Sequence, residues 1–314
     1  MNEPDTDVHT HLQTLYADAI HGLHPCWEPC EWSRVYRLAL HDGTRLFVKG
    51  TPRSRNEALV MHRLHALCSI SLPRVLAVDL VPATTWRWFL MEDAGCCDQS
   101  ALSRSVAIEA ARILGQLHQR ALHDQVLPSW LTRCEGSHLQ QQALAVCRWA
   151  MNQQASAALD DLQRIVSRLQ EARAIFGGLT QQLAELPSTI VHGDFWSGNI
   201  AVAGTTIRLI DWGDALWGVG GVSLINLIMT CDGQLDNAIQ ELWQAYERGW
   251  EQPIGLSYRE ACVVASVVTN LVIDTALARC CGQGPERLPG LMPGLRDLEA
   301  LILRHLPVAG SRHP

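Results

Sequence analysis

Residues 191–199, VHGDFWSGN, place polar side chains between two apolar runs. Asp194 and Asn199 lie five positions apart across a glycine-containing loop, and Asp211 follows Asn199 by twelve positions. Phosphoryl transfer needs a group that positions the acceptor hydroxyl, oxygen ligands for magnesium, and a cation on the nucleotide phosphates. Because magnesium leaves several of its positions to phosphate and water, one amide and one carboxylate suffice as protein ligands. A loop, a hairpin and a second loop would bring the three oxygens together for this chemistry.

The same stretch, HGDFWSGN followed by IDWGD, resembles the catalytic loop and metal-binding segment of the aminoglycoside phosphotransferase family. This family is related to the protein kinases and includes choline, homoserine and fructosamine kinases. The resemblance implies that Asp194 is the catalytic base or hydroxyl positioner and that Asn199 and Asp211 hold Mg2+. It makes His192 a structural brace, while Ser197 either contacts a phosphate or stabilises the turn. A buried Gly/Asp/Asn turn in an unrelated fold is the alternative.

The first hundred residues contain candidates for nucleotide binding. Lys49 closes the run RLFVKG, where kinases carry the lysine that contacts the α- and β-phosphates, although an isolated lysine at a strand end is usually solvated. EWSRVYRLAL resembles the family's nucleotide loop with a serine in place of the glycines, which makes Ser33 a candidate phosphate contact. FLMEDAG resembles the segment between the lobes, so backbone groups from Glu92 to Ala94 would bind adenine. The resemblance therefore implies ATP and Mg2+ as cofactors.

Glu57 admits two roles. In kinases a helix glutamate pairs with the strand lysine and holds it for the phosphates. Only seven residues separate Glu57 from Lys49, which is short for the family. Ser54 lies three positions before Glu57, and this is also the spacing of a capping box at the start of a helix. We expect the ion pair, with the cap as the alternative.

Strand signals dominate the first ninety residues. The runs RVYRLAL and RLFVKG flank the turn HDGT, and its Asp-Gly pair is a strong hairpin signal. SRNEALVMHRLHAL has a helical pattern that opens with Ser54 as N-cap, and LPRVLAVDLV and TWRWFLME indicate two further strands. We therefore expect residues 1–94 to form a small nucleotide-binding lobe, an antiparallel sheet with one helix.

Helical periodicity dominates from residue 95 onward. SRSVAIEAARILGQLHQ carries apolar residues on one helical face, and residues 137–176 add one or two helices. TIVHGDF and NIAVAGTTIRLIDWG indicate a loop and a hairpin that turns at residues 203–204. After Asp214 the pattern is helical to the end, broken by EQPIGLS and by the loop GQGPERLPGLMPG. Residues 95–314 are expected to form a larger, mainly helical lobe with the catalytic loop, metal segment and acceptor site. Together with the resemblance, this predicts an α+β, protein-kinase-like two-lobed fold.

Composition narrows the class of protein. Apolar residues make up 47%, charged residues 18%, and the net charge is −7 without a basic patch, which argues against a nucleic-acid partner. The N-terminus lacks the pattern of a secretory signal. Eleven scattered cysteines indicate reduced thiols, so we expect a cytoplasmic protein. Because no paired CxxC set is present, we do not expect zinc. Residues 261–278 are the only membrane candidate, but polar residues at helical spacing and a Ser257-x-x-Glu260 capping box indicate a buried helix.

These features predict transfer of the γ-phosphate of ATP to a hydroxyl of a small molecule, either a sugar-like or amine-containing metabolite or an antibiotic. With Trp196, the sequence of the loop is more similar to that of fructosamine kinases. An aromatic face can hold a sugar ring or a cationic amine. Asp214 and Glu241 are among the carboxylates that could meet a polycation. The family's usual acidic residue after the metal segment is replaced by ALWGVGGVSLINL, a departure from classical aminoglycoside specificity. A catalytically silent, pseudokinase-like nucleotide-binding regulator and a protein kinase are the alternatives.

Overall fold

The structure, a computed structural model, describes residues 8, 10–14, 20–26, 30, 32–81, 85–95, 102–124, 126–134, 136–152, 163–164, 167, 187–231, 235–250, 256–280 and 296. The chain divides into two compact units, each discontinuous in sequence. The first comprises Met1–Trp130, Asp194–Ala215 and Leu227–Pro253, and the second comprises Leu131–Gly193, Leu216–Asn226 and Ile254–Pro314. The expected division of the chain after residue 94 remains a prediction.

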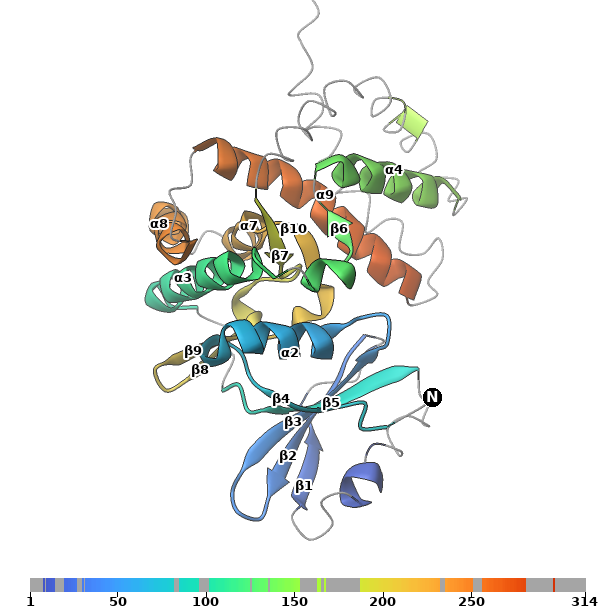
Figure 1. The fold of residues 1–314 in the computed structure, drawn as a ribbon, viewed down its shortest axis with the longest axis vertical. Helices are drawn as coiled ribbons and strands as arrows, with labels where there is room; N and C mark the ends of the chain where they lie inside the picture. Colours follow the sequence, from blue (N-terminus) through green and yellow to red (C-terminus); the bar gives the residue numbers. More distant parts are fainter. Residues whose placement is uncertain are drawn as a thin grey trace, which may run out of the picture. The chain divides into compact units, whose positions relative to one another are not determined.

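The first unit contains a five-stranded antiparallel sheet of order β1-β2-β3-β5-β4 (Figure 1). Its strands are β1 Ile20–Pro25, β2 Arg34–Leu40, β3 Arg45–Pro52, β4 Val75–Val78 and β5 Trp86–Glu92. The predicted β2–β3 hairpin is confirmed, and Gly43 occupies its turn with φ +85°, a conformation that suits glycine. β1 was not predicted, because IHGLHP lacks the alternation of apolar and polar residues that marks a strand.

The two faces of this sheet carry different kinds of side chain. Leu46 and Val48 of β3 belong to a buried apolar cluster with Trp88 and Leu90 of β5. Since side chains alternate along a strand, Lys49 of β3 points to the opposite face. The apolar cluster thus anchors the strands, and the other face is left for the site.

Helix α2, Glu57–Leu67, follows β3 and buries an apolar row of Ala58, Val60, Met61 and Leu64. The predicted N-cap at Ser54 is wrong, and with it the alternative capping-box role of Glu57, because Asn56 is the N-cap and makes no side-chain cap hydrogen bond. β3 runs on to Pro52, and the Arg55 N–H donates to the Pro52 carbonyl oxygen at 2.9 Å. This turn uses the residues that would have started the helix earlier.

Helices α3, Arg104–Ala121, and α8, Ile239–Trp250, also belong to the first unit and pack against each other. α3 begins as predicted after Ser103, whose hydroxyl accepts a backbone hydrogen bond from the first turn. A Cβ at Gly115 or Gly249 would collide with a backbone oxygen of the facing helix. Glycine at these two positions therefore permits the close approach of the helices.

The segment that carries the predicted chemistry contributes a second hairpin to the first unit. β8, Ile200–Ala203, pairs antiparallel with β9, Thr206–Leu209, as predicted. A 3-10 turn, η3 Ser197–Asn199, precedes the hairpin, and another, η4 Trp212–Asp214, follows it. Beyond the paired strands, the Ile210 N–H donates to the Asn199 carbonyl oxygen at 3.1 Å, so the end of η3 is joined to the segment that leads to η4.

The second unit contains a three-stranded sheet of order β6-β10-β7. Its elements are β6 Arg133–Cys134, α4 Gly136–Asn152, β7 Ser188–Val191, β10 Leu216–Val219 and α9 Leu256–Cys280. The helical pattern expected after Asp214 is wrong at β10, whose four residues are all buried and so show no alternation. α9 begins at Leu256, so Ser257 lies inside the helix and is not its N-cap.

Helix α7, Gly221–Thr230, follows β10. Three further 3-10 turns are η1 Ser69–Ser71, η2 Leu127–Ser129 and η5 Asp236–Ala238. α4 covers the first part of the helical stretch expected over residues 137–176, and most of the remainder lies outside the described residues. Over the described part of the chain, no helix is long and apolar enough to cross a membrane.

Candidate active site

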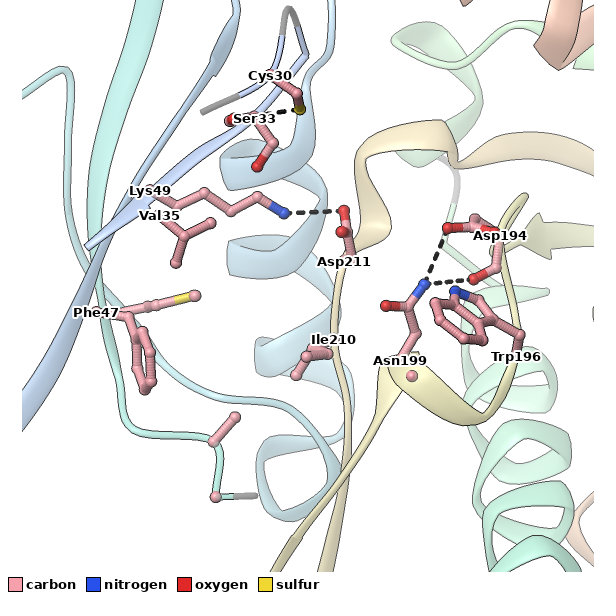
Figure 2. A pocket seen from close by; sticks show the side chains of 14 residues that line it. Cys30, Ser33, Val35, Phe47, Lys49, Asp194, Trp196, Asn199, Ile210 and Asp211 are labelled. Atoms are coloured by element: carbon pink, nitrogen blue, oxygen red, sulfur yellow. Dashed lines mark hydrogen bonds and ion pairs between the residues drawn. The ribbon is translucent and has the colours of Figure 1, made fainter. Parts of the chain in front are cut away.

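A cavity of about 280 Å³ lies in the first unit, on the face of the sheet that carries Lys49 (Figure 2). We call it the Lys49 cavity. Its lining residues come from the sheet strands and from the segment 194–211: Cys30, Ser33, Val35, Phe47, Lys49, Met91, Ala94, Gly95, Asp194, Trp196, Gly198, Asn199, Ile210 and Asp211. The sequence separated its predicted site residues by up to 178 positions, from Ser33 to Asp211, and the fold brings six of the eight onto this one cavity.

Lys49 is the only lysine in the sequence, and it is 4% exposed. Its Nζ donates to Glu57 Oε1 at 2.8 Å and to Asp211 Oδ1 at 2.8 Å. Burial disfavours the charged amine, but the carboxylates of Asp211 and Glu57 outweigh it and raise the pKa of Lys49. The cavity therefore contains a fixed ammonium group.

Glu57 does not line the cavity but lies behind Lys49, where it is 1% exposed. Of the two roles open to it, the structure shows the ion pair with Lys49. Burial raises the pKa of Glu57 to about 7, although the Lys49 ammonium opposes this shift. Its second oxygen, Oε2, has no hydrogen-bond partner among the described residues. The buried Glu57 carboxylate is thus stabilised mainly by its ion pair with Lys49.

Asp194 and Asn199 face the cavity from the loop before β8 (Figure 2). The Asn199 Nδ2 donates to the Asp194 carbonyl oxygen at 2.7 Å and to its Oδ2 at 3.1 Å. These bonds turn the amide oxygen of Asn199 away from Asp194 and toward the segment of Asp211 (Figure 2). Partial burial and the Asp211 charge raise the pKa of Asp194, while the hydrogen bonds from the Asn199 and Trp196 side chains lower it.

Trp196 closes one side of the cavity. A Cβ added at Gly198 would lie 2.5 Å from the indole Cζ2, so the ring lies against the glycine backbone. The indole N–H lies near the Asp194 side chain and lowers the pKa of its carboxyl. The sequence suggested Trp196 only as a substrate contact, and its approach to Asp194 could not be read from the spacing.

Ser33 and Cys30 form a short turn at the entry to β2. The Cys30 N–H donates to the Ser33 carbonyl oxygen at 3.1 Å, and its thiol donates to the same oxygen at 3.3 Å. Cys30 was not among the predicted site residues, because the sequence suggested it only as part of a metal set with His24 and Cys26 that lacks a paired CxxC motif.

The end of β5 supplies the last predicted residues. Ala94 and Gly95 line the cavity, whereas the Glu92 side chain pairs with Arg74 at 3.1 Å. Gly95 has φ +107°, and a Cβ there would lie 2.5 Å from the Val202 carbonyl oxygen of β8. Glycine is therefore required where this segment meets the β8–β9 hairpin. Backbone binding of adenine by residues 92–94 remains a prediction.

A second ion pair, between Arg55 and Asp214, lies close to the carboxylates of Glu57 and Asp211 that pair with Lys49, and it was not predicted. Nη2 of Arg55 lies 2.6 Å from Oδ2 of Asp214. Burial raises the pKa of Asp214 to about 6, against the attraction of Arg55. Asp214 was a candidate to meet a polycationic acceptor, but here its charge is paired within the protein.

His192 and Ser197 have structural surroundings. His192 is fully buried in the second unit, where its N–H donates to the Ser223 hydroxyl at 2.9 Å, as suits a brace. Ser197 is the first residue of η3. Neither lines the Lys49 cavity.

The oxygens of Asn199 and Asp211 are the donors that fit a metal in this cavity. Both are hard oxygen ligands of the kind that Mg2+ prefers. Among the residues that the structure describes, no cluster of three or more His, Cys, Asp or Glu side chains could hold a metal. A metal bound by Asn199 and Asp211 would take its other ligands from phosphate and water.

Solved structures share this fold at low sequence identity. The amicoumacin kinase hAmiN in complex with AMP-PNP, Ca2+ and Ami is 14% identical, with a TM-score of 0.63 and coverage of 96% of both chains. The aminoglycoside phosphotransferase APH(3'')-Id from Streptomyces rimosus is 18% identical, with a TM-score of 0.53 over 86% of this chain and 98% of that one. The spectinomycin phosphotransferase APH(9)-Ia, in complex with ADP and spectinomycin, is 13% identical, with a TM-score of 0.57 over 94% and 93%. These likenesses confirm the predicted α+β, kinase-like fold.

A search of curated proteins found no significant match. The model of the phosphotransferase enzyme family, in contrast, matches residues 31–256, well over half of the chain. This match includes all of the predicted site residues and confirms both the resemblance and the predicted small-molecule kinase class. The chain therefore belongs to the phosphotransferase enzyme family.

Proposed function

We propose that the chain transfers the γ-phosphoryl group of ATP to a hydroxyl of a small molecule in the Lys49 cavity. The observation that carries this proposal is the meeting of Lys49, Asp194, Asn199 and Asp211 in one cavity. These four supply a cation for the phosphates, oxygen ligands for a metal and a carboxylate for the acceptor, which are the parts that phosphoryl transfer needs. Catalysis then rests on positioning and charge neutralisation.

ATP binds along the sheet side of the cavity. The Lys49 ammonium contacts the α- and β-phosphates, Ser33 contacts a phosphate from the entry to β2, and the backbone from Glu92 to Ala94 binds adenine. When Asp211 turns to the metal, Glu57 still holds the ammonium in place, because its carboxylate lies behind Lys49 at 2.8 Å.

Asn199 and Asp211 would hold Mg2+ beside the bound nucleotide. A magnesium ion held there would supply positive charge to the phosphates during transfer. The hydrogen bonds of Asn199 to Asp194 support this assignment, because they commit the amide nitrogen and leave the oxygen to face the Asp211 segment.

Asp194 positions the acceptor hydroxyl and accepts its proton. As the acceptor oxygen bonds to the γ-phosphorus, the bond from that phosphorus to the bridging oxygen breaks and ADP leaves. The bond from Asn199 Nδ2 to Asp194 Oδ2 holds the Asp194 carboxylate in one orientation for this step.

The acceptor is a small hydroxylated molecule, either a sugar-like or amine-containing metabolite or an antibiotic. Among the structural neighbours, the amicoumacin kinase is in complex with AMP-PNP and Ami, and the spectinomycin phosphotransferase with ADP and spectinomycin, which supports a small-molecule acceptor. The Trp196 ring at the cavity offers an apolar face to a sugar ring or a cationic amine. No observation favours the pseudokinase alternative, since the lysine, the carboxylates and the amide are all present.

The test is a screen with γ-labelled ATP and Mg2+ over aminoglycosides, other hydroxylated antibiotics, amino sugars, choline-like alcohols and glycated amines. We expect one class to take up label, and Asp194→Asn to abolish transfer while binding MgATP within about twofold of wild type. Transfer by Asp194→Asn at the native rate would refute the assignment of Asp194. Failure of the wild-type chain to bind MgATP would refute the proposed function.

A further inference from the structure

Arg55 makes two contacts with the turn that follows Asp211. Its Nη2 pairs with Asp214 Oδ2 at 2.6 Å, and its Nε donates to the Gly213 carbonyl oxygen at 3.1 Å. The Arg55 and Asp214 side chains are only 12% and 15% exposed. A planar guanidinium that binds two oxygens at once fixes orientation as well as distance. Arg55 therefore ties η4 to the residues that begin α2.

At Gly213, the η4 turn leaves room for the Arg55 side chain. A Cβ at Gly213 would lie 2.6 Å from Nη2 and 2.8 Å from Cζ of Arg55, so the guanidinium rests against the Gly213 backbone. Any larger residue at position 213 would push it away. The glycine is thus explained by the arginine, which comes from 158 positions earlier in the chain.

Asp211, directly before η4, has a backbone that needs support. Its φ of 62° and ψ of 61° place a non-glycine residue in the left-handed region, which costs free energy. Such a conformation persists only when the surrounding structure holds it. Lys49 binds the side chain of Asp211, and Arg55 binds the turn that starts with it.

The two attachments differ in what happens when the substrate binds. Under the proposed function, Lys49 turns to the phosphates and Asp211 to the metal, so their direct ion pair is broken. Arg55 and Asp214 do not line the cavity, so their pair can persist. The Arg55 pair would then hold η4 against α2 throughout the reaction.

We propose that Arg55 and Asp214 are positioning residues that keep Asp211 in the conformation that binds the nucleotide-bound metal. This inference rests on the proposed function, because it acts through Asp211 as a metal ligand. It predicts that loss of the pair weakens the magnesium-dependent part of nucleotide affinity and leaves the magnesium-independent part intact.

The test must separate the effect of the Arg55 charge on the metal site from the effect of its contacts with η4. Burial opposes the charge of Arg55, but the carboxylates of Asp214, Glu57, Asp211 and Asp194 raise its pKa, so its charge acts on all of them. Removing Arg55 alone would add net negative charge around the metal ligands and by itself attract Mg2+. The double variant Arg55→Met with Asp214→Asn removes one charge of each sign and avoids this effect.

The experiment is isothermal titration of ATP, once with Mg2+ and once with EDTA, into each purified full-length variant. For Arg55→Met/Asp214→Asn we expect the Kd of MgATP to rise about 10–100-fold, as for losses of groups that orient metal ligands. The Kd of ATP in EDTA should stay within about twofold of wild type. Arg55→Lys keeps the charge without the two-point contact, so it should show an intermediate loss, and it serves if the double variant fails to fold.

The matched control is the exposed pair of Arg104 and Glu241, whose side chains are 55% and 44% exposed. Arg104→Met/Glu241→Gln should bind ATP as wild type does under both conditions. If Asp211→Asn loses magnesium-dependent affinity but the Arg55 variants keep it, the positioning role is wrong and the proposed function stands. If wild type itself shows no magnesium-dependent affinity, both are wrong.

Discussion

Replacing Lys49 with methionine tests what stabilises the buried Glu57. Methionine keeps an apolar stem but removes the ammonium that lies 2.8 Å from Glu57 Oε1. Glu57 is 1% exposed, whereas the Asp211 side chain is 37% exposed and can be solvated. Breaking a buried ion pair from one side costs about 3–5 kcal/mol, because it leaves a buried charge without its partner. We expect a loss of this size in the free energy of unfolding of Lys49→Met at pH 8.

The loss should depend on pH in a defined direction. Burial already raises the pKa of Glu57 to about 7 in the presence of Lys49, and removal of the ammonium raises it further. Between the ordinary value of 4.5 and the folded value, the folded protein holds a proton that the unfolded chain releases. The contribution of Glu57 to stability is therefore full below pH 4.5 and falls by about 1.4 kcal/mol per pH unit as the pH rises. This decline ends near pH 7 in wild type and continues above pH 7 in Lys49→Met.

Urea unfolding followed by circular dichroism at pH 6, 7 and 8 measures the effect. Lys49→Met should lose stability relative to wild type between pH 7 and 8, and Lys49→Met/Glu57→Gln should not. A constant offset between Lys49→Met and wild type over this range would refute the assignment of the penalty to a buried, ionising Glu57.

Three further changes probe the cavity and the fold. Trp196→Phe removes the indole N–H that lowers the pKa of Asp194 but keeps an aromatic ring, so turnover should fall about tenfold with an unchanged KM for ATP, since a polar contact to a charged group contributes about 1.5–3 kcal/mol; unchanged turnover in steady-state kinetics would contradict this. Gly95→Ala should lower Tm more than Gly43→Ala, because both have positive φ but only Gly95 meets a backbone oxygen, at 2.5 Å; equal losses in calorimetry would contradict this. Asp214→Asn should become less stable relative to wild type as pH falls from 6 to 4, because the pKa of Asp214 is raised to about 6 and protonation stabilises only the wild-type fold; a pH-independent difference in urea unfolding would argue against that.

Local signals in the sequence predicted the elements that are defined by local physics. The Asp-Gly turn placed the β2–β3 hairpin, and Ser103 marked the start of α3. β10 escaped prediction because a short strand buried on all sides has no alternation, so only its pairing with β6 and β7 identifies it. The start of α2 was misplaced because the turn after Pro52 competes with a capping motif that looks complete in the sequence.

The candidate site likewise contains residues that the local sequence predicted and contacts that it could not predict. Asp194, Asn199 and Asp211 lie within eighteen positions of one another, so their spacing was readable, and the fold does bring them to one cavity. The Arg55–Asp214 pair joins residues about 160 positions apart and carries no local motif. The approach of the Trp196 indole to Asp194 depends on the rotamer of the ring, which no spacing specifies. Contacts of this kind depend on the three-dimensional fold.

The single lysine allows the most direct test of the central claim, that Lys49 meets the phosphates of ATP in this cavity. Protein grown with lysine labelled with 15N at Nζ should give one side-chain ammonium resonance, from Lys49. Titration with the unhydrolysed analogue AMP-PNP and Mg2+ should shift this resonance saturably, with the Kd found by calorimetry, as the ammonium exchanges the Asp211 carboxylate for phosphate. An unchanged Lys49 resonance at a saturating concentration of the nucleotide would contradict the account.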